Sequence, residues 1–155
     1  MDECKNKKAL SLAIKYLTYR QRSEAELITY LDRKSFGNKV INYVLKETKR
    51  YGYIDDLKYA QDFISSRQRK GHGIKRIRYE LQQKNIDGTI IDEVIAEYSD
   101  QVDELERAKY LIENRKRKSD EVDEKWIKRQ AAFLQRRGFD SNIVYKVLKD
   151  YNPSE

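Results

Sequence analysis

The chain has 155 residues, a formal net charge of +7 and 38% charged side chains, a composition typical of a basic, soluble protein. It contains no apolar run long enough to span a bilayer, and residues 1–8 lack the apolar segment of a secretory signal. Its one cysteine, Cys4, has no partner for an internal disulfide, so we expect a cytoplasmic protein in which Cys4 has no functional role.

The first predicted helix carries an apolar stripe that leads into an Arg-x-Arg sequence. Leu10, Ala13 and Leu17 are three and four residues apart, which places them on one face of a helix. The sequence Arg20-Gln21-Arg22 follows this stripe. The spacing therefore predicts a helix that ends near Arg20.

Two further helices are predicted after this motif. Ser23 and Glu26 have the spacing of a capping box, and the helix they would begin contains Leu31. A third helix is indicated by four apolar residues with helical spacing: Val40, Ile41, Val44 and Leu45. Gly52 is expected to end it.

This three-helix pattern occurs three times. Arg-x-Arg returns as Arg67-Gln68-Arg69 and as Arg115-Lys116-Arg117, each time after the same apolar stripe. The stripe residues are Leu57, Ala60 and Ile64 in the second copy and Leu105, Ala108 and Ile112 in the third. The leucine of the second helix also recurs, as Leu31, Leu81 and Leu134. An internal repeat of this length indicates a tandem array of helical units.

The end of each predicted second helix requires a residue in the left-handed conformation. Ser35, Asn85 and Gly138 occupy the equivalent position, and glycine adopts that conformation most easily. We also expect four aspartates to cap the helices that follow them: Asp55, Asp87, Asp100 and Asp140.

The predicted fold is all-α, with three tandem three-helix repeats at residues 9–54, 55–99 and 100–152 and with Pro153 beyond the last helix. A unit of this size cannot bury an adequate core alone, so neighbouring repeats are expected to support one another. The resulting array is predicted to be elongated and curved.

The middle repeat contains a block of six cations without an acid among them, here called the middle basic block: Arg67, Arg69, Lys70, Lys75, Arg76 and Arg78. It surrounds Gly71-His72-Gly73, predicted to be a flexible turn whose backbone amides can approach a phosphate. Segregated positive charge suits contact with DNA phosphates or with an acidic protein. A solvated helix face is the alternative interpretation.

Three smaller groups of cations are also candidate binding residues: Arg20 and Arg22; Arg115, Lys116 and Arg117; Arg136 and Arg137. Acidic residues at 120–124 can pair with the second group. Arg136 and Arg137 precede a predicted helix end, where a capping role competes with a binding role.

The chain has twelve tyrosines, and two interpretations apply to them. Tyr19 and Tyr79 adjoin arginines, so they are candidates for stacking on single-stranded bases. The aromatic residues on or beside the apolar stripes are expected to pack at the edge of the core: Tyr43, Tyr59, Tyr110, Tyr145 and Trp126.

The sequence offers no catalytic or cofactor-binding motif. His72 is the only histidine and has no triad pattern, and the chain lacks a phosphate-binding loop and a transition-metal ligand set. Asp55 and Asp56 are neighbours and do not share a helix face, so capping explains them better than metal binding. We expect a protein that is not an enzyme and needs no cofactor or metal.

Several of these motifs, in this order and spacing, resemble the RecX family of bacterial regulators of the recombinase RecA. The resemblance covers nearly the whole chain and includes Arg20-Gln21-Arg22-Ser23, Gly52-Tyr53-Ile54-Asp55-Asp56, Arg76-Ile77, Glu80-Leu81 and Arg136-Arg137-Gly138-Phe139. The chain departs from the family at Ser35 and Asn85, where the family often has glycine.

The resemblance implies a cytoplasmic protein of three-helix repeats that binds along the RecA–DNA filament and represses ATP turnover, strand exchange and recombination by RecA. It also implies direct binding to single-stranded and double-stranded DNA and a role in DNA repair and the SOS response. From the composition we expect no membrane association, and we expect a monomer. Two alternatives stay open at this point. One is a sequence-nonspecific DNA-binding protein without a recombinase partner, and the other is a scaffolding repeat protein.

Overall fold

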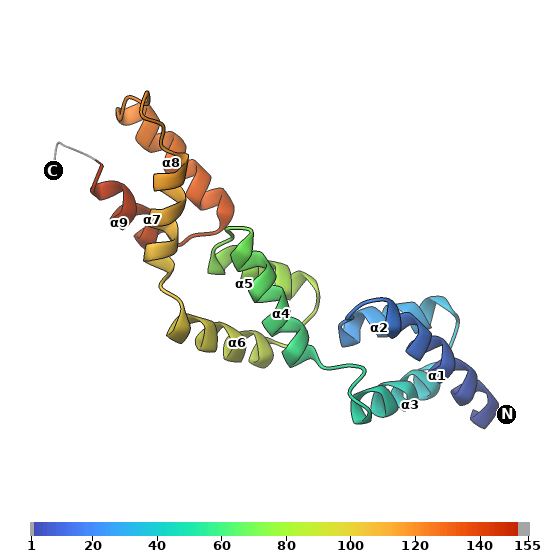
Figure 1. Cartoon of the computed structure of the whole chain (residues 1–155). Helices are drawn as coiled ribbons and strands as arrows, with labels where there is room; N and C mark the ends of the chain where they lie inside the picture. Colours follow the sequence, from blue (N-terminus) through green and yellow to red (C-terminus); the bar gives the residue numbers. More distant parts are fainter. Residues whose placement is uncertain (1, 152–155) are drawn as a thin grey trace. The chain divides into compact units, whose positions relative to one another are not determined.

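The computed structural model describes residues 2–151, and within that range the chain forms nine α-helices and no strand (Figure 1). The helices are α1 (Asp2–Tyr19), α2 (Glu24–Arg33), α3 (Asn38–Arg50), α4 (Asp56–Arg69), α5 (Ile74–Gln83), α6 (Gly88–Gln101), α7 (Glu104–Arg115), α8 (Glu124–Arg137) and α9 (Ser141–Lys149). The predicted all-α class with three three-helix repeats is confirmed. The predicted repeat end at residue 152 and the position of Pro153 lie outside the described residues.

Equivalent positions of the three repeats are buried to the same degree. The alanines of the stripe are fully buried in every copy, at Ala13, Ala60 and Ala108. The aligned leucines are also fully buried, at Leu31, Leu81 and Leu134. Because these side chains lose all contact with water, the sequence repeat is also the repeat of the core.

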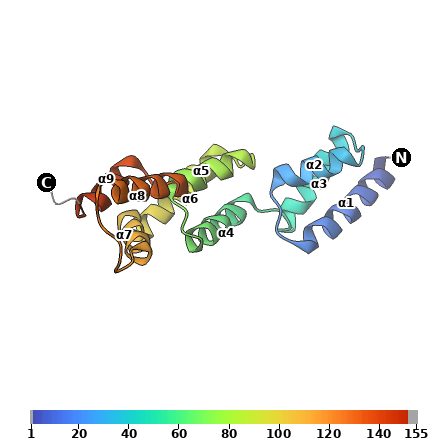
Figure 2. The ribbon, with the colours of Figure 1, turned by 90° about the horizontal axis from the view of Figure 1, so that it is seen from above.

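The first and third repeats each pack two helices on a third. In the first repeat α1 and α2 contact α3, and the core includes Leu27 and Val44. In the third repeat α7 and α8 contact α9 (Figure 2). Trp126 is 1% exposed in the core of the third repeat, as predicted for a packing residue.

The second helix of each repeat ends in the same backbone motif. Ser35, Asn85 and Gly138 all have positive φ, at 68°, 58° and 93°, which confirms the predicted left-handed position. The amide of the residue that follows donates to the carbonyl of the repeated leucine, at 3.2, 3.2 and 3.1 Å. This bond joins residues five positions apart and is the wider-spanning of the two hydrogen bonds in a Schellman motif. The second helix of every repeat therefore ends in the same chain reversal.

The predicted helix caps are confirmed with one exception. Asp55 accepts from the Lys58 amide, Asp87 from the Thr89 amide and Asp140 from the Asn142 amide. Ser23 accepts from the amide of Glu26 at 3.2 Å. The prediction for Asp100 is wrong, because α6 continues to Gln101 and the residue that caps α7 is Asp103.

The described chain packs as two compact units. Residues up to Asp62 form the first unit together with Leu81–Ile91, and Phe63–Glu80 form the second with the residues from Asp92 on. The middle repeat contributes to both units. None of the helices within residues 2–151 is long and apolar enough to cross a membrane.

Within each unit, an acid from one repeat caps a helix of the repeat before it. In the first unit the amide of Glu24, the first residue of α2, donates to Asp56 at 2.8 Å. In the second unit the amide of Ile74, the first residue of α5, donates to Glu104 at 3.2 Å. Asp56 and Glu104 are themselves the first residues of α4 and α7, and they hold equivalent places before Arg-x-Arg. The sequence analysis did not identify this contact.

Candidate nucleic-acid interface

The Gly71-His72-Gly73 turn joins α4 to α5 and is buried, with His72 only 7% exposed. The Gly71 amide donates to Gln68 and the His72 amide to Arg67, at 2.9 and 3.0 Å. The Gly73 amide donates to the carbonyl of Arg137 at 2.7 Å. The prediction of a flexible turn whose amides approach a phosphate is therefore wrong, since the protein itself binds these amides.

Two glycines allow the α4–α5 turn to lie against the α8–α9 turn. A Cβ on Gly73 would lie 2.5 Å from the carbonyl oxygen of Gly138, and a Cβ on Gly138 would lie 2.2 Å from the Cβ of Arg76. The Lys75 amide donates to the same Gly138 carbonyl at 3.0 Å. The start of α5 is therefore fixed on the backbone of the third repeat.

Three arginines of the middle basic block form ion pairs with acids. Glu80 contacts Arg67 at 2.8 Å and Arg76 at 3.0 Å, and Arg78 contacts Asp92 at 2.7 Å. Burial raises the pKa of Glu80, but the Arg76 hydrogen bond and the positive charges around it outweigh burial and leave the pKa below its ordinary value. Glu80 is therefore charged at neutral pH and offsets part of the block.

Burial, reinforced by Arg76, lowers the pKa of His72. The imidazole is therefore neutral at pH 7 and adds no positive charge to this surface.

The other three cations of the block are exposed. Arg69 and Lys70 lie at the end of α4, and Lys75 lies in the first turn of α5. Among the described residues none of these three side chains forms an ion pair. The uncompensated positive charge of the middle basic block is thus concentrated at Arg69, Lys70 and Lys75, which are available to an anionic partner.

Arg137, a candidate cation of the third repeat, contacts the backbone beside the middle basic block in the second unit. The guanidinium of Arg137 donates to the Lys70 carbonyl at 2.8 Å, so Arg137 caps the end of α4. Arg115 and Arg137 both lie over the ring of Phe133, at 3.7 and 5.2 Å from its centroid. Burial, together with the charges of Arg136 and Arg137, lowers the pKa of Arg115.

The three remaining candidate binding cations of the third repeat are exposed. They are Lys116, Arg117 and Arg136. The amide of Arg117 donates to the carboxylate of Asp120 at 2.8 Å, while its side chain stays in solvent. The predicted local pairing with the acids at 120–124 thus involves the Arg117 backbone.

Arg20 and Arg22, in the first unit, share one acid. Glu26 contacts Arg20 at 3.2 Å and Arg22 at 3.9 Å, and it accepts from the Tyr59 hydroxyl at 3.1 Å. Burial, followed by the charge of Glu26, raises the pKa of Tyr59 to about 12, so this hydroxyl remains a donor at neutral pH. Arg22 is already committed to Glu26 and to the ring of Tyr16, 4.1 Å away.

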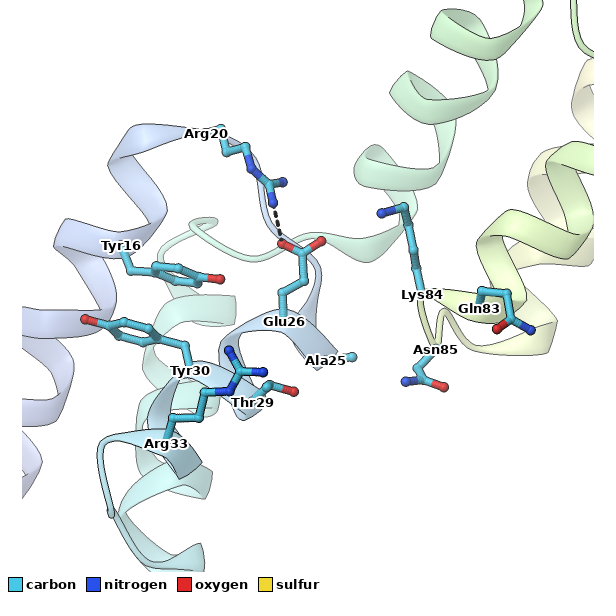
Figure 3. A pocket seen from close by; sticks show the side chains of 10 residues that line it. All are labelled: Tyr16, Arg20, Ala25, Glu26, Thr29, Tyr30, Arg33, Gln83, Lys84 and Asn85. Atoms are coloured by element: carbon cyan, nitrogen blue, oxygen red, sulfur yellow. Dashed lines mark ion pairs between the residues drawn. The ribbon is translucent and has the colours of Figure 1, made fainter.

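Arg20 and Glu26 border a hollow of about 460 Å³, which Figure 3 shows. Tyr16 and Tyr30 stack with centroids 4.1 Å apart, and Arg33 extends beside them. Gln83, Lys84 and Asn85 line the opposite side. Both faces of the tyrosine pair are covered, by Arg22 and by Lys34, so these rings offer no free face to a base.

The structure confirms only part of the predicted division of the tyrosines into core-edge and exposed residues. Tyr59 is buried and Tyr43 half-buried, as expected for the edge of the core. Tyr110 and Tyr145 are 67% and 60% exposed, so the prediction that they pack at the edge of the core is wrong. Tyr110 is two residues from both Ala108 and Ile112, which turns it about 200° away from that stripe. The stacking candidates Tyr19 and Tyr79 are exposed.

Arg107 and Glu104 support the candidate surface and were not identified from the sequence. Arg107 donates to the carbonyls of Gln68 and His72, at 3.0 and 2.9 Å, and it pairs with Glu104. Arg107 also donates to the hydroxyl of Tyr98 at 2.6 Å. The positions equivalent to Arg107 are Leu12 and Tyr59, so the repeat pattern contains no signal for this contact.

Family models match the three repeats separately and in order. The first, second and third three-helix domains of RecX match residues 9–47, 55–95 and 102–148. A Regulatory protein RecX from Chlorobium phaeobacteroides strain BS1 is 38% identical over 149 residues, which is 96% of each chain. Another, from Oceanobacillus iheyensis, is 30% identical, and the match spans 96% of this chain but 55% of that protein.

A solved structure supports the fold. The crystal structure of RecX from Lactobacillus salivarius matches with a TM-score of 0.84, covering 96% of this chain and 97% of that chain, at 22% identity. The three family models and the 38% identical relative show the family directly: this chain belongs to the RecX family of regulatory proteins.

Proposed function

We propose that this protein binds the filament that RecA forms on DNA and inhibits RecA ATPase, strand exchange and recombination. The observation that carries the proposal is the match of all three RecX domain models in order along the chain. The exposed cations Arg69, Lys70 and Lys75 give the contact a physical basis, because both DNA phosphates and acidic side chains attract them. A protein bound along the filament would either block the entry of a second DNA strand or favour disassembly of the filament.

We also propose that the protein is cytoplasmic, since the filament it would bind forms on DNA inside the cell, and we retain the expectation of a monomer. The repeat limits 9–54, 55–99 and 100–152 are retained as part of this proposal. The candidate contact residues of the first and third repeats, Arg20, Arg22, Arg115, Lys116, Arg117, Arg136 and Arg137, are retained as well. We assign all of these a smaller contribution than Arg69, Lys70 and Lys75, and four of them, Arg20, Arg22, Arg115 and Arg137, already contact other protein groups.

The first prediction concerns the recombinase. Added at less than one molecule per RecA protomer, this protein should suppress ATP hydrolysis by RecA on single-stranded DNA and should suppress strand exchange. The expected reason is that one bound molecule affects several protomers of a cooperative filament. The measurement is a steady-state ATPase assay with increasing amounts of the protein.

Free DNA in excess provides the control for this assay. If added DNA fully restores the ATPase rate, the protein merely competes with RecA for DNA, and the recombinase proposal is lost. Persistent inhibition would support the filament as the target.

A second candidate function is sequence-nonspecific DNA binding without a recombinase partner. The net charge of +7 and the three exposed cations of the middle basic block favour it. If about six cations meet phosphates, DNA affinity should fall by about three decades between about 50 and 200 mM salt, with little dependence on base sequence. Fluorescence anisotropy at several salt concentrations measures this slope, and a flat response would remove the electrostatic account.

A further inference from the structure

Tyr110 lines a hollow in the second unit together with two cations of the middle basic block. The hollow measures about 420 Å³, and its lining includes Arg69, Lys70, Tyr110 and Leu111. The side chain of Tyr110 is 67% exposed, and neither its ring nor its hydroxyl has a partner among the described residues. The hollow thus combines a free aromatic ring with two cations that form no ion pair.

We call this hollow the Tyr110 hollow. Several contacts fix the backbone segments that line it. A Cβ on Gly71 would lie 3.3 Å from Leu111, so the α4–α5 turn packs closely on α7. Arg107 binds the carbonyls of Gln68 and His72, and Arg137 binds the carbonyl of Lys70. Because the backbone that carries the cations is fixed to the helix that carries Tyr110, a ligand has to order only the side chains of Arg69 and Lys70, and not the backbone, on binding.

The charges of the hollow indicate where an anion can lie. Its one acid is Glu106, which is exposed and pairs with Lys109 at 3.5 Å. Arg69 and Lys70 come from the end of α4, whereas Glu106 comes from α7. A phosphate is attracted to the α4 side and repelled from Glu106, while an apolar ring can lie on Tyr110 and Leu111.

We propose that the Tyr110 hollow binds one nucleotide of single-stranded DNA, with the base stacked on Tyr110 and its phosphates beside Arg69 and Lys70. An unpaired base has a free face for stacking, whereas a base within a duplex does not. This site would be part of the surface that carries the proposed function. It rests on that function in one respect only, namely that the RecA filament supplies the single-stranded DNA in the cell. An acidic protein segment would use the cations without the ring, and the experiment separates the two ligands.

The test compares two labelled oligonucleotides of equal length, oligothymidine and an abasic strand, in the absence of RecA. Tyr110→Leu should weaken binding of oligothymidine by about tenfold and leave binding of the abasic strand unchanged, because the stacking contribution alone is removed. Tyr110→Phe should bind oligothymidine like the unmodified protein. Tyr145→Leu is the matched control, since Tyr145 is similarly exposed at 60% on α9, and it should change neither affinity.

Two outcomes would overturn the stacking site. One is a Tyr110→Leu protein that binds both strands like the unmodified protein, and the other is an equal loss for both strands with unchanged helix content by circular dichroism. In the first of these outcomes, an accompanying loss of RecA inhibition would assign the hollow to a protein ligand. If this protein shows the Tyr110-dependent preference for bases but does not inhibit RecA, the nucleotide site is supported and the proposed function is wrong.

Discussion

The combined change Arg69→Glu, Lys70→Glu and Lys75→Glu should abolish inhibition of RecA and weaken DNA binding by about two orders of magnitude or more. Three exposed cations without ion pairs would be replaced by three anions that repel phosphates. Helix content and melting temperature should change little, because surface substitutions usually shift stability by about 0.5 kcal/mol or less each. RecA ATPase and DNA anisotropy measure the two losses.

The matched control is the combined change Lys116→Glu, Arg117→Glu and Lys118→Glu. It alters the net charge by the same amount at three exposed residues that follow α7. We expect it to retain most of the inhibition. If the control protein loses inhibition while the change at Arg69, Lys70 and Lys75 does not, the contact belongs to the third repeat and our assignment is wrong.

The second large effect is expected from Gly138→Ala. The new Cβ would lie 2.2 Å from the Cβ and 2.5 Å from the amide nitrogen of Arg76, and φ at this position is 93°. The left-handed conformation alone costs about 1–2 kcal/mol for a residue with a Cβ, and the contact with Arg76 forces the two turns apart. We expect the free energy of unfolding to fall by about 3 kcal/mol or more, as measured by urea denaturation.

Gly88→Ala is the control for this substitution. Nothing lies within 4 Å of a Cβ on Gly88, which is the first residue of α6. Alanine there should leave stability unchanged or raise it by up to about 1 kcal/mol. Equal stability of the Gly138→Ala protein and the unmodified protein would mean that the α4–α5 and α8–α9 turns do not meet as described.

Features that depend on near neighbours in the sequence could be predicted. The stripe around Ala13 follows from helical periodicity, and the left-handed residues at Ser35, Asn85 and Gly138 follow from the need to reverse the chain after each second helix. These requirements recur with the repeat, so each copy supported the prediction for the others. The helical fold and most helix ends were therefore available from the sequence.

Features that depend on distant contacts could not be predicted. Asp100 was expected to cap a helix because it stands before the first predicted helix of the third repeat, but α6 continues to Gln101 and Asp103 has this role. A cation remains unpaired only where the fold places no acid beside it. Glu80 and Asp92 pair with Arg67 and Arg78 because the fold brings these side chains together. Tyr110 was misplaced because adjacency to an apolar stripe does not determine which way a side chain turns.

The acids Asp56 and Glu104 have a consequence for the order in which the protein folds during synthesis. Each acid caps a helix that was made earlier, since Asp56 binds the amide of Glu24 and Glu104 binds that of Ile74. The first α-helical turn of α2 thus lacks this partner until about thirty more residues have left the ribosome, and the same holds for α5. Each of the first two repeats thus receives a helix cap from its successor, so a nascent chain that stopped after the first or second repeat would leave this amide without its partner.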